Sequence, residues 1–270
     1  MKNRRTFIGG IVAFILLMTI ASCDYLFEYS PYQNIVKAKW KQQNVKSIEK
    51  LALVDNRAFE SFKVGLISDS HTYYDELEKQ IDYLNTRKDL DFIIHLGDIT
   101  LSSNIREFEW YSELVNRINV PVFTLIGNHD CLGNGYSIYT EMFGEANFLF
   151  TYKGVKFVFF DDVVWEKSIQ DPDFEWFEKA IANDEDNKYV IPFSHIPPWD
   201  QQFTYGNELF YNYLLEESGI DLSVHGHGHS YDYAQVYGDV NYLSVPSCIR
   251  DELITLDFQA DTILIDRIHY

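Results

Sequence analysis

Short apolar runs and stretches of helical periodicity alternate along the chain from about residue 63 onward. The runs have the length of a strand, and the stretches between them repeat apolar residues every three or four positions, as a helix buried on one face does. The apolar runs are Val64–Ser68, Asp91–Leu96 and Pro121–Ile126, and the helical stretches are Asp75–Lys88 and Phe108–Ile118. This alternation predicts βαβ units with buried parallel strands.

The second half of the chain continues the alternation and then ends in strands alone. The next expected strands are Val155–Phe160, Tyr189–Phe193 and Leu222–His225, and the next expected helices are Phe174–Ala182 and Leu209–Glu217. The tail has four more strand-like runs separated by turns, at Tyr233–Val236, Val240–Val245, Leu253–Phe258 and Thr262–Ile268. Such a tail indicates a meander. The whole pattern predicts an α/β fold of two stacked mixed β-sheets flanked by helices.

The first residues have the pattern of an export signal. Residues 2–5 are basic, and Phe7–Ala21 is an apolar run of 15 residues, short for a membrane-spanning helix. The run ends in Ile20-Ala21-Ser22-Cys23, which resembles a bacterial lipobox, where the signal is cleaved just before a lipid-carrying cysteine. An uncleaved membrane anchor is the alternative. The pattern favours a lipoprotein of the bacterial cell envelope, attached through Cys23 to a membrane outside the cytoplasm.

The chain divides into three expected parts. They are a signal peptide (residues 1–22), a lipid-anchored tether with a helical lead-in (23–62) and one domain (63–270), which suits the length of 270 residues. Arg4-Arg5 also resembles a twin-arginine export pattern, but basic starts are common, so Sec export is the favoured interpretation.

Charge and cysteine content narrow the range of partners. The net charge is −19, and loss of the signal with its three basic residues takes it to −22. Binding to duplex nucleic acid is not expected, because it requires a basic surface. For the same reason, membrane attachment is expected to rest on the lipid alone. The three cysteines exclude a disulfide scaffold and a four-cysteine zinc site, and leave the pairing of Cys131 with Cys248 to geometry.

Polar clusters follow five of the expected strands at the point where each strand ends. Their members are Asp69 and His71, then Asp98, then Asn128 with His129 and Asp130, then His195, and last His227 with His229. In open α/β sheets, ligands bind at the carboxyl ends of the strands. These residues, far apart in the sequence, are therefore expected to converge.

Each cluster alone has an ordinary structural explanation. An Asp after a strand is commonly a turn residue or a helix cap, and a single His is more often a buried side chain than a ligand. Together, however, carboxylates, imidazoles and an amide at one edge are costly to bury unless they are paired or bind metal. Nitrogen and oxygen donors without thiolate suit Zn, Fe or Mn, and seven donors exceed what one ion needs. Two metal ions are the expectation.

These motifs, in this order, resemble the calcineurin-like metallophosphoesterase family over about residues 63–229. The resemblance implies an αββα domain whose two divalent or mixed-valence metal ions are Mn, Fe or Zn. It also implies a first half-site (Asp69, His71 and His229) and a second half-site (Asn128, His195 and His227). Asp98 would bridge the two ions, and a bridging hydroxide would attack phosphorus. His129 would donate to the phosphoryl or leaving oxygen, with Asp130 orienting it.

The function implied is hydrolysis of a small phosphate ester, as a phosphomonoesterase or a phosphodiesterase. A catalytically inactive metal-binding scaffold or sensor of the same fold is the alternative, and the intact ligand set with His129 favours the enzyme. One departure is that Ile99-Thr100-Leu101 follows Asp98, where some members carry a further Asp or Asn. His225 and His95 are expected to be strand residues and not ligands. Leu132–Tyr139 is expected to be a specificity loop.

Overall fold

The computed structural model describes residues 33–53, 58–182 and 187–270. The expected signal peptide, Cys23 and the start of the expected tether lie outside these ranges. Asn34–Tyr270 form one compact unit. Within the described ranges, no helix is long and apolar enough to cross a membrane.

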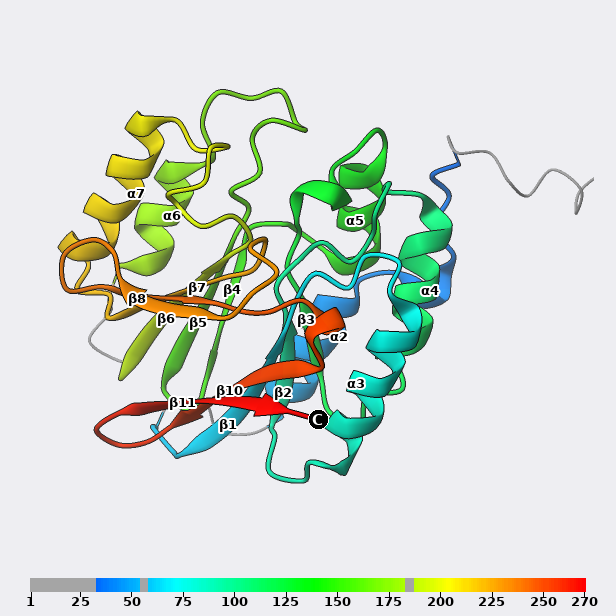
Figure 1. The fold of residues 1–270 in the computed structure, drawn as a ribbon, viewed down its shortest axis with the longest axis horizontal. Helices are drawn as coiled ribbons and strands as arrows, with labels where there is room; N and C mark the ends of the chain where they lie inside the picture. Colours follow the sequence, from blue (N-terminus) through cyan, green and yellow to red (C-terminus); the bar gives the residue numbers. More distant parts are fainter. Residues whose placement is uncertain (1–32, 54–57, 183–186) are drawn as a thin grey trace, which may run out of the picture. The chain divides into compact units, whose positions relative to one another are not determined.

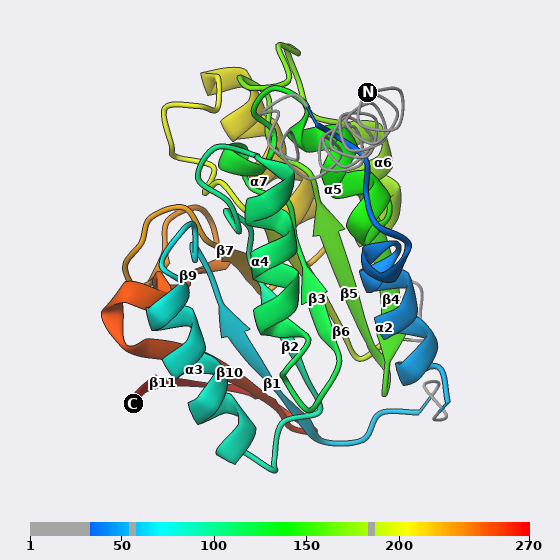
Figure 2. The same ribbon diagram turned by 90° about the vertical axis from the view of Figure 1, so that its right-hand side faces the viewer.

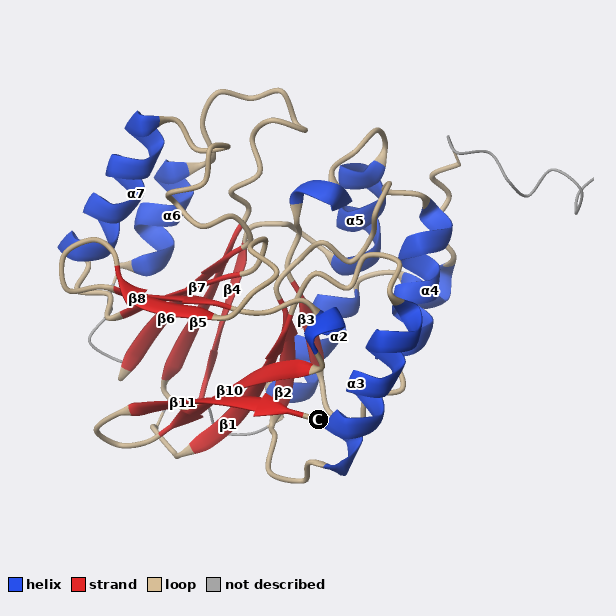
Figure 3. Cartoon of the chain, in the orientation of Figure 1, coloured by secondary structure: helices blue, strands red, loops and turns tan. Residues whose placement is uncertain are grey.

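Two β-sheets and the helices that cover them make up this unit (Figure 3). The helical elements are η1 (Ala38–Trp40), α2 (Gln43–Leu51), α3 (Tyr74–Thr86), α4 (Ile105–Val115), η2 (Asn128–Asp130), α5 (Gly135–Phe143), α6 (Phe174–Ile181), α7 (Tyr205–Glu217) and η3 (Cys248–Arg250). The strands are β1 (Phe62–Ile67), β2 (Phe92–His95), β3 (Val122–Thr124), β4 (Phe148–Tyr152), β5 (Val155–Phe160), β6 (Tyr189–Ser194), β7 (Leu222–His225), β8 (Asp232–Gln235), β9 (Asn241–Ser244), β10 (Glu252–Phe258) and β11 (Ile263–His269).

Both sheets are mixed, as the alternation of elements predicts. The first has the strand order β11-β10-β1-β2-β3, and the second has the order β4-β5-β6-β7-β9-β8. β1, β2 and β3 are parallel, whereas β10 is antiparallel to β1. β5, β6, β7 and β9 are also parallel. The predicted fold class, two stacked mixed sheets flanked by helices, is confirmed.

Aromatic side chains fill a hydrophobic core to which strands of both sheets contribute. Phe92 of β2 lies 5.2 Å from Phe157 of β5, measured between ring centroids, and Phe123 of β3 stacks on Phe150 of β4 at 4.3 Å. All four side chains are buried and belong to one hydrophobic cluster. Because burying each such ring contributes about 2–3 kcal/mol, this cluster holds the two sheets in a defined relation. The edges that carry the polar clusters are therefore fixed as well.

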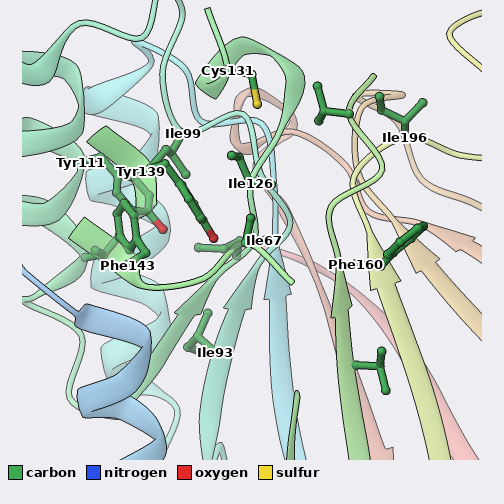
Figure 4. Close-up of a cluster of buried hydrophobic side chains, with 14 of the residues drawn as sticks. Ile67, Ile93, Ile99, Tyr111, Ile126, Cys131, Tyr139, Phe143, Phe160 and Ile196 are labelled. Atoms are coloured by element: carbon green, nitrogen blue, oxygen red, sulfur yellow. The ribbon is translucent and has the colours of Figure 1, made fainter. Parts of the chain in front are cut away.

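Helices cover the outer face of each sheet. α3 and α4 lie in front of β1, β2 and β3, with α2 and α5 beside them, while α6 and α7 cover the second sheet (Figures 1 and 2). Figure 4 shows Tyr111 of α4 gathered with Tyr139 and Phe143 of α5. The Tyr111 hydroxyl lies 2.9 Å from Oγ1 of Thr124, and the Tyr139 hydroxyl donates to the Thr124 carbonyl. These contacts join both helices to the last residue of β3.

The expected helical lead-in packs on the edge of the first sheet. Asn44 of α2 exchanges two hydrogen bonds with the backbone of Thr124, each of 2.9 Å, and Ser47 donates to the Val122 carbonyl at 2.8 Å. These bonds occupy backbone groups of β3, the edge strand, which would otherwise be open to pairing with another chain. Trp40 and Leu51 of this segment are buried.

The tail differs from the expected meander. β8 and β9 complete the second sheet, whereas β10 and β11 extend the first, so the chain crosses between sheets after β9. Ser247 lies in this crossing and pairs with Ser68 in an isolated bridge. Nothing in the local pattern of a strand says which sheet it joins, because the apolar and polar alternation is the same in both.

Two elements were not predicted. α5 occupies most of Leu132–Tyr139, so that expectation of a loop is wrong from Gly135 onward. β4 forms a hairpin with β5 through Lys153 and Gly154, whose φ angles are +47° and +72°. A two-residue turn with both φ values positive is usually marked by Asn-Gly or Asp-Gly. Lys-Gly is a weaker signal.

Candidate metal centre

All seven expected metal ligands lie just past the carboxyl ends of strands. β1 and β2 lead to Asp69, His71 and Asp98, β3 leads to Asn128, and β6 and β7 lead to His195, His227 and His229. Because β1, β2 and β3 are parallel in one sheet and β6 and β7 in the other, these ends meet at matching edges.

The backbone is unusual at most of these positions. Five of the seven residues have positive φ angles, a region that non-glycine residues rarely adopt and that costs on the order of 1–3 kcal/mol each. They are Asp69 (50°), His71 (42°), Asp98 (55°), His227 (61°) and His229 (54°). Backbone strain concentrated in this way is typical of functional sites, where it fixes the direction of the side chains.

The first half-site is a compact group of donor atoms. Ligand atoms of Asp69, His71 and His229 lie within 4.8 Å of one another. Nε2 of His229 is 3.3 Å from Oδ1 of Asp69 and 3.4 Å from Nε2 of His71. The other Asp69 oxygen accepts hydrogen bonds from the Ser68 hydroxyl (2.5 Å) and the His227 amide (3.1 Å). The carboxylate is thus held with Oδ1 toward the two imidazoles.

Asp98 lies between the two half-sites. Ligand atoms of Asp98, His195 and His227 lie within 4.8 Å of one another. Ligand atoms of Asp98, His71 and His129 form a second such group. Oδ2 of Asp98 is 3.2 Å from Nε2 of His195 and 3.8 Å from Nε2 of His71. Asp98 therefore contacts imidazoles of both half-sites, which is the placement that a bridging carboxylate requires.

Three donor atoms of the set fit a cation because nothing else satisfies them. Oδ1 of Asp69, Oδ1 of Asn128 and Nε2 of His195 are buried, and each lacks a hydrogen-bond partner among the described residues. The short distances from His195 and His229 to carboxylates lack the alignment of hydrogen bonds. Burying such atoms unpaired costs about 1–3 kcal/mol each. A bound cation in each half-site would satisfy these atoms.

Backbone carbonyls set the orientation of the imidazoles. Nδ1 of His71 lies 2.9 Å from the Thr100 carbonyl, and Nδ1 of His195 lies 2.6 Å from the Leu96 carbonyl. Each Nδ1–H must therefore donate, which leaves the lone pair of Nε2 for a metal in the neutral ring. Thr100 belongs to the Ile99-Thr100-Leu101 segment that follows Asp98, and its main chain supplies the group that orients His71.

His129 lies at the edge of the site and is partly exposed. Its amide donates to Oδ1 of Asp98 at 2.8 Å, and its Nδ1 lies 2.8 Å from the Leu101 carbonyl. The orienting role that the family resemblance implies for Asp130 stays a prediction. The Asp130 carboxylate accepts bonds from backbone amides of Gly127, Ile99 and Thr100 and from the Thr100 hydroxyl. Asp130 thus holds the loop that carries Leu101, whose carbonyl contacts the His129 ring.

Charges within the site are strongly coupled. Burial disfavours a charged His195, but the Asp98 and Asp69 carboxylates outweigh it and raise the pKa of His195 to about 10. Burial likewise opposes ionisation of Asp98, yet His195 holds the pKa of Asp98 well below its usual range. Burial and then the Asp98 charge raise the pKa of Asp130 to about 7. In the protein without cations a proton on His195 balances Asp98, so cation binding is expected to release it.

His225 and His95 are structural, as expected. Both ring nitrogens of His225 are engaged, with Ser194 Oγ at 3.0 Å and Ser223 Oγ at 2.9 Å. His95 is buried, with Nε2 3.0 Å from Ser70 Oγ. Burial lowers the pKa of each to about 3, so both are neutral.

The cysteines near the site are thiols. Cys131 and Cys248 are both free and buried, which answers the question of their pairing. Burial raises the pKa of each thiol, so neither has the character of a reactive thiolate.

Three carboxylates beside the second half-site were missed. Glu166 contacts Asn128, Asp200 contacts His227, and Asp162 accepts from the amide that follows His195. Asp162 is the second residue after β5, so the rule applied to the other strand ends would have found it. Glu166 and Asp200 lie in loops, where an acidic residue carries no distinguishing pattern.

Comparison with known proteins agrees with this geometry. The sequence model described as calcineurin-like phosphoesterase matches residues 62–231. No curated protein sequence matches the chain. The structure of a dimetal phosphatase from Danio rerio has a TM-score of 0.62 at 13% identity, over 76% of this chain and 95% of that one.

Two further structures share the fold. A purple acid phosphatase from yellow lupin (Lupinus luteus) seeds has a TM-score of 0.62 at 14% identity, over 78% of this chain and 52% of that one. GAP50, the anchor in the inner membrane complex of Plasmodium, has a TM-score of 0.57 at 14% identity, over 77% of this chain and 84% of that one. At these identities the likeness concerns the fold.

Proposed function

The chain belongs to the calcineurin-like phosphoesterase family, and from this we propose that it hydrolyses small phosphate esters with a dinuclear metal centre. The observation that carries the proposal is a set of buried donor atoms that have no hydrogen-bond partner in the part of the chain that the structure describes, one each on Asp69, Asn128 and His195. They occur in both half-sites, and Asp98 contacts imidazoles of both.

Each half-site would hold one cation. Asp69, His71 and His229 would bind the first, and Asn128, His195 and His227 the second, with Asp98 shared. When bound, two such cations lower the pKa of water and neutralise charge on a phosphoryl group.

His129 is the residue placed to handle a proton. Its Nδ1 is held by the Leu101 carbonyl, so Nε2 is the nitrogen available to a substrate. In the protonated ring this nitrogen donates to the phosphoryl oxygen or to the leaving group. The amide bond from His129 to Asp98 keeps the ring beside the shared carboxylate.

The proposal includes a location. The basic start, the short apolar run and Cys23 support export by the Sec route, followed by lipid attachment in the bacterial envelope. The membrane would then be a partner through the lipid on Cys23, and the substrate would be met outside the cytoplasm.

A reconstitution experiment tests the activity. Chelator-treated protein is loaded with Mn²⁺, Fe²⁺ or Zn²⁺ and assayed with p-nitrophenyl phosphate and bis(p-nitrophenyl) phosphate. Two ions per chain and metal-dependent release of nitrophenol are expected, and the preferred compound separates monoesterase from diesterase. Two ions without hydrolysis of either compound would favour the scaffold or sensor. A chain that binds no metal and hydrolyses neither compound would overturn both functions.

A further inference from the structure

The two half-sites differ in the charge of their ligands. The first contains the carboxylate of Asp69, whereas Asn128, His195 and His227 of the second are neutral as ligands. Asp98 is shared, so a divalent cation in the second half-site meets less negative charge. Unless nearby groups compensate, this ion would be bound more weakly.

Glu166 lies against the amide ligand of the second half-site. Nδ2 of Asn128 donates to Oε1 of Glu166 at 3.3 Å. A carboxylate can only accept, so this contact places the amide nitrogen toward Glu166 and the amide oxygen away from it. That oxygen is the buried atom without a partner among the described residues. Glu166 thus selects the orientation in which Asn128 can bind a cation.

Asp200 lies against the His227 imidazole of the same half-site. Its Oδ2 is 3.5 Å from Nε2 of His227, and both side chains are mostly shielded from solvent, with exposed fractions of 24% and 21%. The other Asp200 oxygen accepts from the Gln202 amide at 2.9 Å. The Asp200 amide donates to the Pro197 carbonyl at 2.9 Å, so the turn that carries the carboxylate is fixed. With Nε2 turned to Asp200, the other ring nitrogen of His227 is left for a cation.

We propose that Glu166 and Asp200 are positioning residues that orient Asn128 and His227 and supply the negative charge that the second half-site lacks. The inference rests on the proposed dinuclear centre and assigns the affinity of its second ion to two loops, β5–α6 and β6–α7. A third carboxylate, that of Asp162, lies on the same side of the centre. It is buried, and its Oδ2 accepts a hydrogen bond from the Ile196 amide at 2.9 Å. Carboxylates that orient metal ligands typically change metal affinity 10–100-fold when removed.

Step-resolved metal binding tests this assignment. Chelator-treated Glu166→Gln and Asp200→Asn proteins are titrated with Mn²⁺ by isothermal calorimetry beside the wild type. Each variant is expected to weaken the second binding step by about 10–100-fold and to leave the first within about twofold. Glu166→Gln keeps an acceptor for Asn128 and removes the charge, so Glu166→Ala, which removes both, is expected to weaken the step further.

A matched control uses an acidic residue away from the site. Glu175 of α6 is 82% exposed and pairs with Lys179, so Glu175→Gln removes one charge from the surface and is expected to change neither step. Thermal unfolding of the metal-free proteins shows that the variants are folded. Wild-type constants for both steps in both carboxylate variants, or equal weakening of both steps, would overturn the inference. Failure of the wild type to bind two Mn²⁺ ions would instead overturn the proposed centre.

Discussion

Asp162 provides a sharp test of the electrostatics around the site. The residue is fully buried at the end of β5, and its Oδ1 has no hydrogen-bond partner among the described residues. Burial raises the pKa of this carboxyl from 3.8 to about 7. Asp162→Asn keeps an oxygen that can accept from the Ile196 amide and removes the ionisable group. In the metal-free protein this variant should therefore change the dependence of stability on pH.

The direction and size follow from linkage. Because the pKa is higher in the folded state, the stability contributed by Asp162 is complete below the unfolded value of 3.8 and is lost as pH rises to about 7. At about 1.4 kcal/mol per pH unit the total loss is about 4 kcal/mol, of which roughly 1.6 kcal/mol is already lost at pH 5. The asparagine does not titrate, so the stability of the variant relative to wild type should rise by about 3 kcal/mol between pH 5 and pH 8.

Urea unfolding at both pH values, with chelator present, measures this difference. Other groups with shifted pKa values, such as Asp130, titrate in both proteins and cancel to first order. Asp171→Asn removes the same charge from an exposed position and should show no such change. If the stability of Asp162→Asn relative to wild type stays constant from pH 5 to pH 8, or falls, the argument that burial raises the pKa of Asp162 is refuted.

Three further outcomes are expected. Gly127→Ala should destabilise the protein by about 1–3 kcal/mol and weaken metal binding, since a Cβ there would collide with the backbone nitrogen and Oδ1 of Asp98. Urea unfolding and Mn²⁺ titration that are unchanged from the wild type would contradict this prediction. His129→Ala should lower kcat about 10²–10⁴-fold and leave both Mn²⁺ constants unchanged, and wild-type kcat would remove its proposed role. Cys23→Ser should move the protein from the membrane fraction to the soluble one and abolish labelling by a fatty-acid analogue, whereas retained label would contradict lipid attachment.

The sequence predicts best where an element follows from its own residues. Val155–Phe160 and Leu222–His225 have the bounds that their apolar runs indicate. α7 begins at Tyr205, four residues before its expected start, because the Thr204 side chain accepts from the Asn207 amide and caps the helix. The crossing between β9 and β10 has no local signal, since what places β10 in the first sheet is its pairing with β1, near the opposite end of the domain sequence.

The candidate site shows the same division. Seven candidate ligands could be named because each follows a recognisable strand, and the structure brings donor atoms of six of them together in overlapping groups. Side-chain partners were less accessible to prediction. The Leu101 carbonyl that orients His129, and the carboxylates of Glu166 and Asp200, depend on loop conformation, which short-range sequence patterns do not determine.

The division of the donor atoms between two sheets has a consequence for when the site can form. Asp69 and the His227 amide that bonds to it are 158 residues apart, so their contact requires both halves of the chain to have been made and folded. Metal capture is thus a late event and reports on completed folding. Under the proposed Sec route, in which the chain crosses the membrane unfolded, the centre could not be loaded beforehand. The metal centre would then take its ions from those present outside the cytoplasm, independently of the metal ions available inside it.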